Sequence, residues 1–197
     1  MTREMIFALA LGYLFGSIPF GLLLTRWSGR GDIREVGSGN IGATNVLRTG
    51  SKPLAALTLV LDCLKGTAAI LLARAIWPDT SGVFAGTGAM LGHLYPAWLG
   101  FKGGKGVATF FGVLIALMPV AAMVYAAVWI LLLLTIRISS VAGMTAAISA
   151  PITAAVRGDE TYFPMLLGLA LLVLWKHREN IRRLLAGSEP RIGKAKA

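Results

Sequence analysis

The sequence predicts an all-α integral membrane protein, a bundle of seven transmembrane helices. Of its 197 residues, 56% are hydrophobic and only 14% are charged, and the mean hydropathy is +0.72, well outside the usual balance of soluble proteins. Several apolar runs have the roughly 17 to 25 residues that span a bilayer. The sequence contains no linker or clear repeat, so residues 1–197 are expected to form a single membrane domain.

Three apolar runs predict spanning helices directly, because each has the required length and is bounded by Gly, Pro or charge. They are Glu4–Arg26, Pro53–Trp77 and Ser81–Leu99. The first is expected to be an anchor and not a signal peptide, since little positive charge precedes it and it lacks a small-x-small cleavage site.

The second half of the chain is less regular. Residues Val107–Ile136 are compatible with one tilted helix or with two short helices broken near Met118–Pro119, because proline interrupts a helix. Two shorter spans, Val141–Val156 and Tyr162–Trp175, precede a basic tail.

The distribution of basic residues favours the break near Pro119. With seven helices, fifteen Lys and Arg residues fall on one side of the membrane and three on the other. Because cytoplasmic loops are enriched in Lys and Arg, we expect an N-terminus outside and a C-terminus in the cytoplasm. Gly-xxx-Gly spacings such as Gly12/Gly16 and Gly88/Gly92 predict close packing inside the bundle, with a dimer face as the alternative.

The first polar segment, Arg34–Arg48, is rich in Gly and Asn and follows the first helix. Its glycines let backbone N–H groups approach an anion, and Arg48 can form a bidentate pair with phosphate. The candidate binding groups are Ser38, Gly39, Asn40, Gly42, Thr44 and Asn45. The segment predicts a phosphate-binding loop; a capped turn before a helix is the alternative.

The second polar segment, Phe101–Thr109, combines lysines with glycines at the predicted start of a helix, where phosphate is attracted. Lys105 and three glycines, Gly103, Gly104 and Gly106, are its candidate site residues. A positive-inside anchor would explain the lysines but not the glycines. The segment is not a Walker A loop, since that motif is absent.

The third polar segment, Trp175–Pro190, follows the last predicted helix. If that helix continues beyond the membrane, His177, Asn180 and Arg183 share one face. Ser140 is expected on the same side of the membrane as a further donor. Solvated juxtamembrane charge is the alternative.

Asp62 and Lys65 lie three residues apart inside the second helix. Since an unpaired charge there costs about 2.5 to 3.5 kcal/mol, we expect a structural ion pair, with support of the site loops or transport as alternatives. His93 is expected to be structural and distant from the other polar groups.

Three motifs, Ser38–Asn45, Lys102–Gly106 and His177–Leu184, closely resemble those of the bacterial acyl-phosphate:glycerol-3-phosphate acyltransferases, the PlsY family. The resemblance implies transfer of a fatty acyl group from acyl phosphate to the 1-hydroxyl of sn-glycerol 3-phosphate. The products would be 1-acylglycerol 3-phosphate and phosphate, in the first acylation of phospholipid synthesis.

The resemblance also implies roles for individual residues. Ser38, Arg48, His177 and Asn180 would be needed for activity, and the glycines of the second motif would bind glycerol phosphate. Glu189 would be structural. With Lys105 added for its charge, the candidate catalytic residues are Ser38, Arg48, Lys105, His177 and Asn180.

The chemistry implied by the resemblance suits these residues. Two phosphate-bearing substrates repel each other, so a site that joins them needs several cations and N–H donors. An acyl phosphate has a good leaving group, so neither a metal, a cofactor nor an enzyme nucleophile is expected. His177 or the phosphate of the donor itself would accept the hydroxyl proton.

Other functions fit the sequence less well. The H-x-x-x-x-D pattern and the multiple aspartates of two other lipid-enzyme classes are missing. An anion transporter would use Pro119 and the Asp62–Lys65 pair near mid-membrane, and an assembly protein would not need Ser38 or His177. We expect a monomer in the bacterial cytoplasmic (inner) membrane that contacts membrane lipids but no nucleic acid, with its site on the cytoplasmic face.

Overall fold

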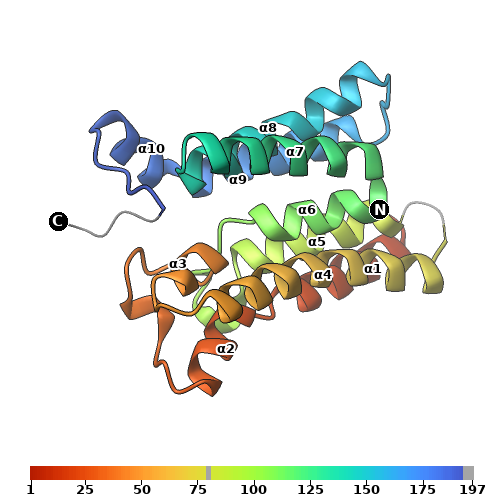
Figure 1. Cartoon of the computed structure of the whole chain (residues 1–197). Coiled ribbons are helices and arrows are strands. Elements are labelled where there is room, and N and C mark those ends of the chain that lie inside the picture. The colour runs from red at the N-terminus through yellow and green to blue at the C-terminus, as the bar shows by residue number, and fades with distance from the viewer. Residues whose placement is uncertain (79–80, 193–197) are drawn as a thin grey trace. The chain divides into compact units, whose positions relative to one another are not determined.

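The computed structural model describes residues 1–78 and 81–192, and every regular element within those residues is helical (Figure 1). This confirms the all-α prediction. The described chain divides into two compact units, one from Met1 to Leu117 and one from Met118 onward. The single-domain expectation stays a prediction. Two basic residues of the predicted tail, Lys194 and Lys196, lie outside the described residues.

The first unit contains six α-helices and two short 3₁₀ turns among its described residues. They are α1 Arg3–Gly16, α2 Phe20–Trp27, η1 Ile33–Glu35, α3 Ala43–Leu47, α4 Lys52–Ile76, α5 Ser81–Leu94, η2 Ala97–Leu99 and α6 Val107–Leu117. Helices α4, α5 and α6 contact one another, and α1 packs along α5. The first two polar segments therefore belong to one packed helical unit.

Two helix limits differ from the prediction. The expected helix Glu4–Arg26 is interrupted between Gly16 and Phe20, because Pro19 lacks an N–H and disfavours helical backbone at the preceding residue. The expected helix Ser81–Leu99 ends at Leu94 for the same reason, two residues before Pro96. In each case the prediction followed apolarity across a proline.

Glycines allow α1 and α5 to pack with their backbones in contact. A Cβ added to Gly12 would lie 2.0 Å from the carbonyl oxygen of Ala85, and one added to Gly88 would lie 2.1 Å from that of Leu9. Gly16 lies equally close to Ala89. The structure thus confirms that these Gly-xxx-Gly spacings serve packing within the bundle.

The second unit contains four helices among its described residues: α7 Pro119–Thr135, α8 Ser139–Val156, α9 Phe163–Lys176 and α10 Arg178–Leu185. Helix α8 contacts both α7 and α9. Because α6 ends at Leu117 and α7 begins at Pro119, the predicted break near Met118–Pro119 is confirmed.

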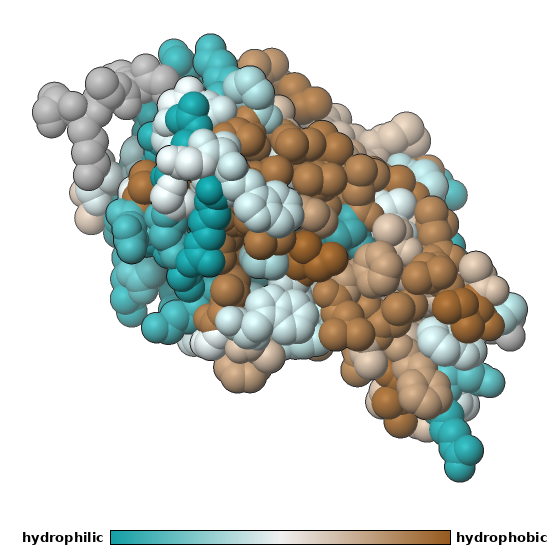
Figure 2. Space-filling model, turned by 90° about the horizontal axis from the view of Figure 1, so that it is seen from below, coloured by the Kyte–Doolittle hydropathy of each residue, from teal (hydrophilic) through white to brown (hydrophobic). Residues whose placement is uncertain are grey.

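Three stretches of the described chain are long and apolar enough to cross a membrane: Arg3–Trp27, Lys52–Ile76 and Ser139–Val156. Three further apolar helices, α6, α7 and α9, are shorter. Figure 2 shows hydrophobic residues over a broad part of the surface that faces the viewer. Large exposed apolar side chains include Phe7, Leu71, Leu134 and Leu171. These surfaces suit lipid and not water.

The contact between α1 and α5 provides a test of the packing. Gly12→Ala is expected to lower the free energy of unfolding by about 1 to 3 kcal/mol, because its methyl group would overlap the carbonyl of Ala85. Gly168→Ala in α9 is the matched control, since a Cβ there meets no atom within 4 Å. Thermal unfolding of both variants in detergent compares them. Equal stability of the two variants would contradict the packing described here.

Candidate active site

The side-chain amide of Asn45 organises the first polar segment. Asn45 is only 2% exposed, and its Nδ2 donates to the carbonyl oxygens of Ile33, Val36 and Asn40 at 2.8 to 2.9 Å. Its Oδ1 accepts the backbone N–H of Ser38 at 3.1 Å. The amide is therefore used to hold the loop together, and direct contact of Asn45 with substrate stays a prediction.

Ser38 and Arg48 both lie close to this amide. The Ser38 hydroxyl donates to Asn45 Oδ1 at 3.3 Å. A Cβ added to Gly37, which has a φ of +57°, would lie 2.7 Å from Arg48 Cδ and from Asn45 Oδ1. Ser38 and Arg48 are exposed whereas Asn45 is buried. The structure thus brings together Ser38 and Arg48, the two candidate catalytic residues of this segment.

The remaining candidates of this segment surround the start of α3. Asn40 Oδ1 accepts the Gly42 N–H at 2.8 Å, and Gly42 is the N-cap of α3. Thr44 is exposed in the first turn. Their contact with a ligand stays a prediction.

A carboxylate that was not predicted from the sequence, that of Asp32, holds the chain in place just before the first polar segment. Asp32 accepts hydrogen bonds from Arg34 at 2.6 Å and from Arg26 at 2.7 Å, and it caps η1 through the Arg34 N–H. These interactions, first among them the side-chain bond from Arg34, hold the pKa of Asp32 well below its usual range. The signal in the sequence was a single Asp between two arginines.

The second polar segment lies against the C-terminal end of α5. The Gly103 N–H donates to Leu94 O at 3.3 Å, and the Gly104 N–H donates to His93 O at 2.9 Å. A Cβ added to Gly103 would lie 2.1 Å from His93 O, and Gly106 has a φ of +87°. These glycines let the loop pack on the helix, while their contact with a substrate stays a prediction.

Asp62 and Lys65 form the expected ion pair. Lys65 Nζ lies 2.6 Å from Asp62 Oδ1, and both side chains are at most 4% exposed. Lys65 also donates to Ile18 O at 2.8 Å. The prediction for His93 was partly wrong, because its Nδ1 lies only 3.7 Å from Asp62 Oδ1. Asp62 lies on the face of α4 that is directed toward His93 of α5. The prediction considered only how deep His93 lies in the membrane, and depth does not show which faces of two helices meet.

Glu189 draws together the polar residues of the second unit. Its carboxylate accepts hydrogen bonds from Ser140 Oγ at 2.6 Å, Asn180 Nδ2 at 2.6 Å and Arg183 Nε at 2.7 Å. Burial opposes the charge of Glu189, but these three donors together lower its pKa. Ser140, Asn180 and Arg183 thus meet at one carboxylate, and the structural role of Glu189 stays a prediction.

His177 lies at a break between two helices. The sequence left open whether the last helix continues past the membrane; in the structure, α9 ends at Lys176 and α10 begins at Arg178. His177 is 3% exposed, and its Nδ1 lies 2.8 Å from Val173 O. Since a carbonyl oxygen only accepts hydrogen bonds, Nδ1 carries the proton in the neutral ring and Nε2 is the basic nitrogen.

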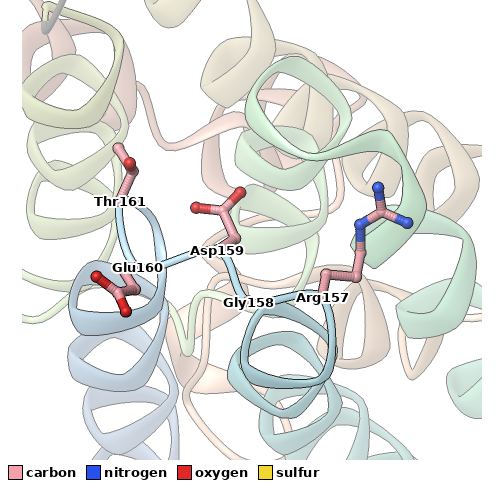
Figure 3. Close-up of a pocket in the computed structure, with 5 residues that line it drawn as sticks. All are labelled: Arg157, Gly158, Asp159, Glu160 and Thr161. Atoms are coloured by element: carbon pink, nitrogen blue, oxygen red, sulfur yellow. The ribbon is translucent and has the colours of Figure 1, made fainter.

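A hollow of about 440 Å³ lies at the turn between α8 and α9. It is lined by Arg157, Gly158, Asp159, Glu160 and Thr161. Figure 3 shows the charged side chains of these residues pointing in different directions. None of them is a candidate site residue. Among the described residues, no group of three or more His, Cys, Asp or Glu side chains could hold a metal ion.

Comparison with known proteins gives the family. Residues 6–187 match the family model described as glycerol-3-phosphate acyltransferase. The chain belongs to this family. The matched range includes most of both units, the first two polar segments, and His177 and Asn180.

Curated members of the family are similar over nearly their whole length. The glycerol-3-phosphate acyltransferase of Mesorhizobium japonicum is 56% identical over 193 residues, which cover 98% of each chain. That of Agrobacterium fabrum is 53% identical over 194 residues, covering 98% of this chain and 95% of the relative. The family resemblance suggested by the motifs is confirmed.

Solved structures support the same assignment. A crystal structure of PlsY (YgiH), an integral membrane glycerol 3-phosphate acyltransferase, in its glycerol 3-phosphate form is 42% identical with a TM-score of 0.90, covering 96% of each chain. Its lysophosphatidic acid form has a TM-score of 0.88 at 40% identity, covering 96% of this chain and 95% of that one. The chain is therefore a multi-pass membrane acyltransferase of phospholipid biosynthesis.

The carboxylate of Glu189 gives a prediction about pH. Because its pKa in the folded protein is lowered, its charge stabilises the fold above the ordinary carboxyl pKa of about 4.3, and this stability is lost as the pH falls through the lower folded value. Glu189→Gln is expected to cost about 1 to 3 kcal/mol at neutral pH and to flatten the loss of stability in acid.

Thermal unfolding in detergent over a series of pH values measures both effects. Glu160→Gln, at an exposed position of the same unit, is the control and should follow wild type. An unchanged acid slope in Glu189→Gln would contradict the assigned role of the carboxylate.

Proposed function

We propose that the protein transfers a fatty acyl group from acyl phosphate to the 1-hydroxyl of sn-glycerol 3-phosphate. The products are 1-acylglycerol 3-phosphate and inorganic phosphate. The observation that carries the proposal is the similarity, over 96% of the chain, to one enzyme solved in a glycerol 3-phosphate form and in a lysophosphatidic acid form. The first ligand is the proposed acceptor, and the second is the proposed lipid product.

The proposed reaction exchanges one bond at the acyl carbon for another and transfers one proton. The hydroxyl oxygen of glycerol 3-phosphate attacks the acyl carbon, and the bond from this carbon to the phosphate oxygen breaks with its electron pair leaving on phosphate. The hydroxyl proton passes to His177 Nε2 or to a phosphate oxygen. Since phosphate is a good leaving group, the reaction needs no covalent enzyme intermediate.

The first unit supplies cations and donors in this proposal. Arg48 is exposed beside Ser38, and its guanidinium can bind phosphate through two parallel hydrogen bonds. Lys105 adds a second positive charge on the glycine-rich loop. Cations are required because two phosphate-bearing substrates repel each other, and their approach must be stabilised in the transition state.

The second unit supplies a base and an oriented amide. The contact of His177 Nδ1 with Val173 O favours the tautomer in which Nε2 can accept a proton. Glu189 accepts from Asn180 Nδ2 and from the Ser140 hydroxyl, which fixes the orientation of both side chains. Both residues are thus orienting groups for a polar substrate.

We also propose that the chain crosses the bacterial cytoplasmic membrane seven times as a monomeric single domain. The N-terminus is outside, and the polar segments and the C-terminus are cytoplasmic. The positive-inside distribution supports this orientation, and the break between α6 and α7 supplies the extra helix. The acyl chain reaches the site from the bilayer.

An assay of the donor tests the proposed reaction. Purified protein is incubated with glycerol 3-phosphate and either palmitoyl phosphate or palmitoyl-CoA, and lysophosphatidate and phosphate are measured. We expect product from the acyl phosphate alone. Arg48→Ala and His177→Ala should each lower kcat/KM on the order of 100-fold or more, because each removes a group that acts in the transition state.

Arg3→Ala is the control for the assay, because Arg3 is an exposed cation at the start of α1 with no role in the proposal. Circular dichroism of each variant verifies folding. Product from palmitoyl-CoA at the same rate would refute the donor, and full activity of folded Arg48→Ala would refute the role of that residue.

Reporter fusions test the orientation. Alkaline phosphatase, which is active only outside the cytoplasm, should be inactive when fused after Trp175 and active when fused after Trp77, because an odd number of helices separates these two points in the proposed topology. An active fusion after Trp175 would show that the region Val107–Ile136 crosses the membrane once and not twice.

A further inference from the structure

A buried group of polar side chains lies beneath the second polar segment. It contains Asp62 and Lys65 of α4 and His93 of α5, all at most 4% exposed. Helices α4, α5 and α6 lie side by side at this place (Figure 1), and α6 continues directly from the glycine-rich loop. None of these three side chains has a role in the proposed reaction.

The Asp62–Lys65 pair is anchored on several sides. Lys65 Nζ contacts Asp62 Oδ1 at 2.6 Å, donates to Ile18 O at 2.8 Å and lies 5.7 Å from the centroid of the Phe20 ring. Since burying a charge without a partner is costly, the carboxylate is held in place by its own ion pair. It therefore provides a fixed acceptor facing α5.

The imidazole of His93 lies between this carboxylate and the glycine-rich loop. Nδ1 lies 3.7 Å from Asp62 Oδ1. On the other side of the ring, a Cβ added to Gly104 would lie 2.1 Å from Nε2 and 2.6 Å from Cε1. The backbone of Gly104 thus rests directly on the ring, and the Gly104 N–H donates to His93 O.

We propose that His93 is a positioning residue, oriented by the Asp62–Lys65 pair. Its ring determines the position of the Gly103–Gly106 loop and thereby places Lys105 against substrate phosphate. His93 itself does not touch substrate. This inference rests on the proposed role of Lys105 in binding phosphate.

Geometry explains why a rigid ring is needed. Gly104 has no side chain to anchor itself, so its position is determined by the surface on which it packs and by its backbone hydrogen bond. Lys105 follows immediately, and any shift of Gly104 moves the Cα of Lys105 with it. A displacement of about 1 Å at a group that contacts substrate can cost on the order of 100-fold in reaction rate. The surface beneath Gly104 therefore determines how well Lys105 contacts substrate phosphate.

A double-mutant cycle on ligand binding tests the proposal. His93→Asn keeps a polar group near the position of Nδ1, facing Asp62, and removes the Nε2 side that supports Gly104. Calorimetry with glycerol 3-phosphate should give a Kd raised about tenfold in His93→Asn and in Lys105→Ala. The double variant should bind no more weakly than Lys105→Ala alone, because residues that act through one contact are not additive.

The proposal would be overturned if the increases in Kd of the two single variants multiply in the double variant. It would also be overturned if His93→Asn binds glycerol 3-phosphate as tightly as wild type. Thr87→Val in the same helix is the control, since the Thr87 hydroxyl bonds to Val83 O within α5, and it should bind as wild type does. If His93→Asn only destabilised the fold, it would lower the amount of folded protein, and its effect on binding would still add to that of Lys105→Ala.

A steric pair gives a second measurement of the contact between His93 and Gly104. Gly104→Ala places a methyl group against the His93 ring and should abolish binding in the wild-type background. His93→Asn vacates that space, so the Gly104→Ala/His93→Asn double variant should bind glycerol 3-phosphate better than Gly104→Ala. A double variant that is no better than Gly104→Ala would count against the contact.

Binding is measured without any acyl donor, so the two proposals fail differently. If wild type binds glycerol 3-phosphate but makes no product from acyl phosphate, the proposed donor is refuted. The double-mutant cycle on binding can still be interpreted in that case. Wild type that makes product while Lys105→Ala binds normally refutes the inference about His93 and leaves the reaction established.

Discussion

The ion pair between Asp62 and Lys65 is the interaction on which the first unit depends most. A charge inside an apolar helix is costly unless a partner of opposite charge is held close by. Each member therefore fixes the other, and their remaining contacts fix what surrounds them. Lys65 binds the carbonyl of Ile18 at the interruption between α1 and α2, where Pro19 leaves backbone groups outside regular helical bonding. Asp62 faces His93, on which the glycine-rich loop lies.

A single side chain with several hydrogen-bonding positions also organises two other polar regions. Asn45 holds the backbone of the first polar segment, and Glu189 holds the side chains of Ser140, Asn180 and Arg183 in the second unit. Polar groups that bind phosphate are flexible when isolated, and the buried partners reduce the entropy that binding must overcome.

Local chemistry explains where prediction from sequence succeeded and failed. The break at Pro119 was found because the charge distribution also required it, whereas the equivalent effect of Pro19 was missed because the apolar run continues across it. His177 ends a helix although no glycine or proline marks the place. Its side chain bonds back to Val173 O, a contact within the chain that leaves no signature in hydrophobic periodicity.

The sequence by itself determined the membrane class and the family, because hydropathy, charge and motif spacing are local properties. It also identified the Asp62–Lys65 pair, since three residues separate neighbours on one helix face. Only the tertiary structure decided that His93 supports Gly104, that the amide of Asn45 is used internally and that Ser140, Asn180 and Arg183 share Glu189. These contacts join residues far apart in the chain, and their partners are selected by helix packing and backbone approach, which no local pattern encodes.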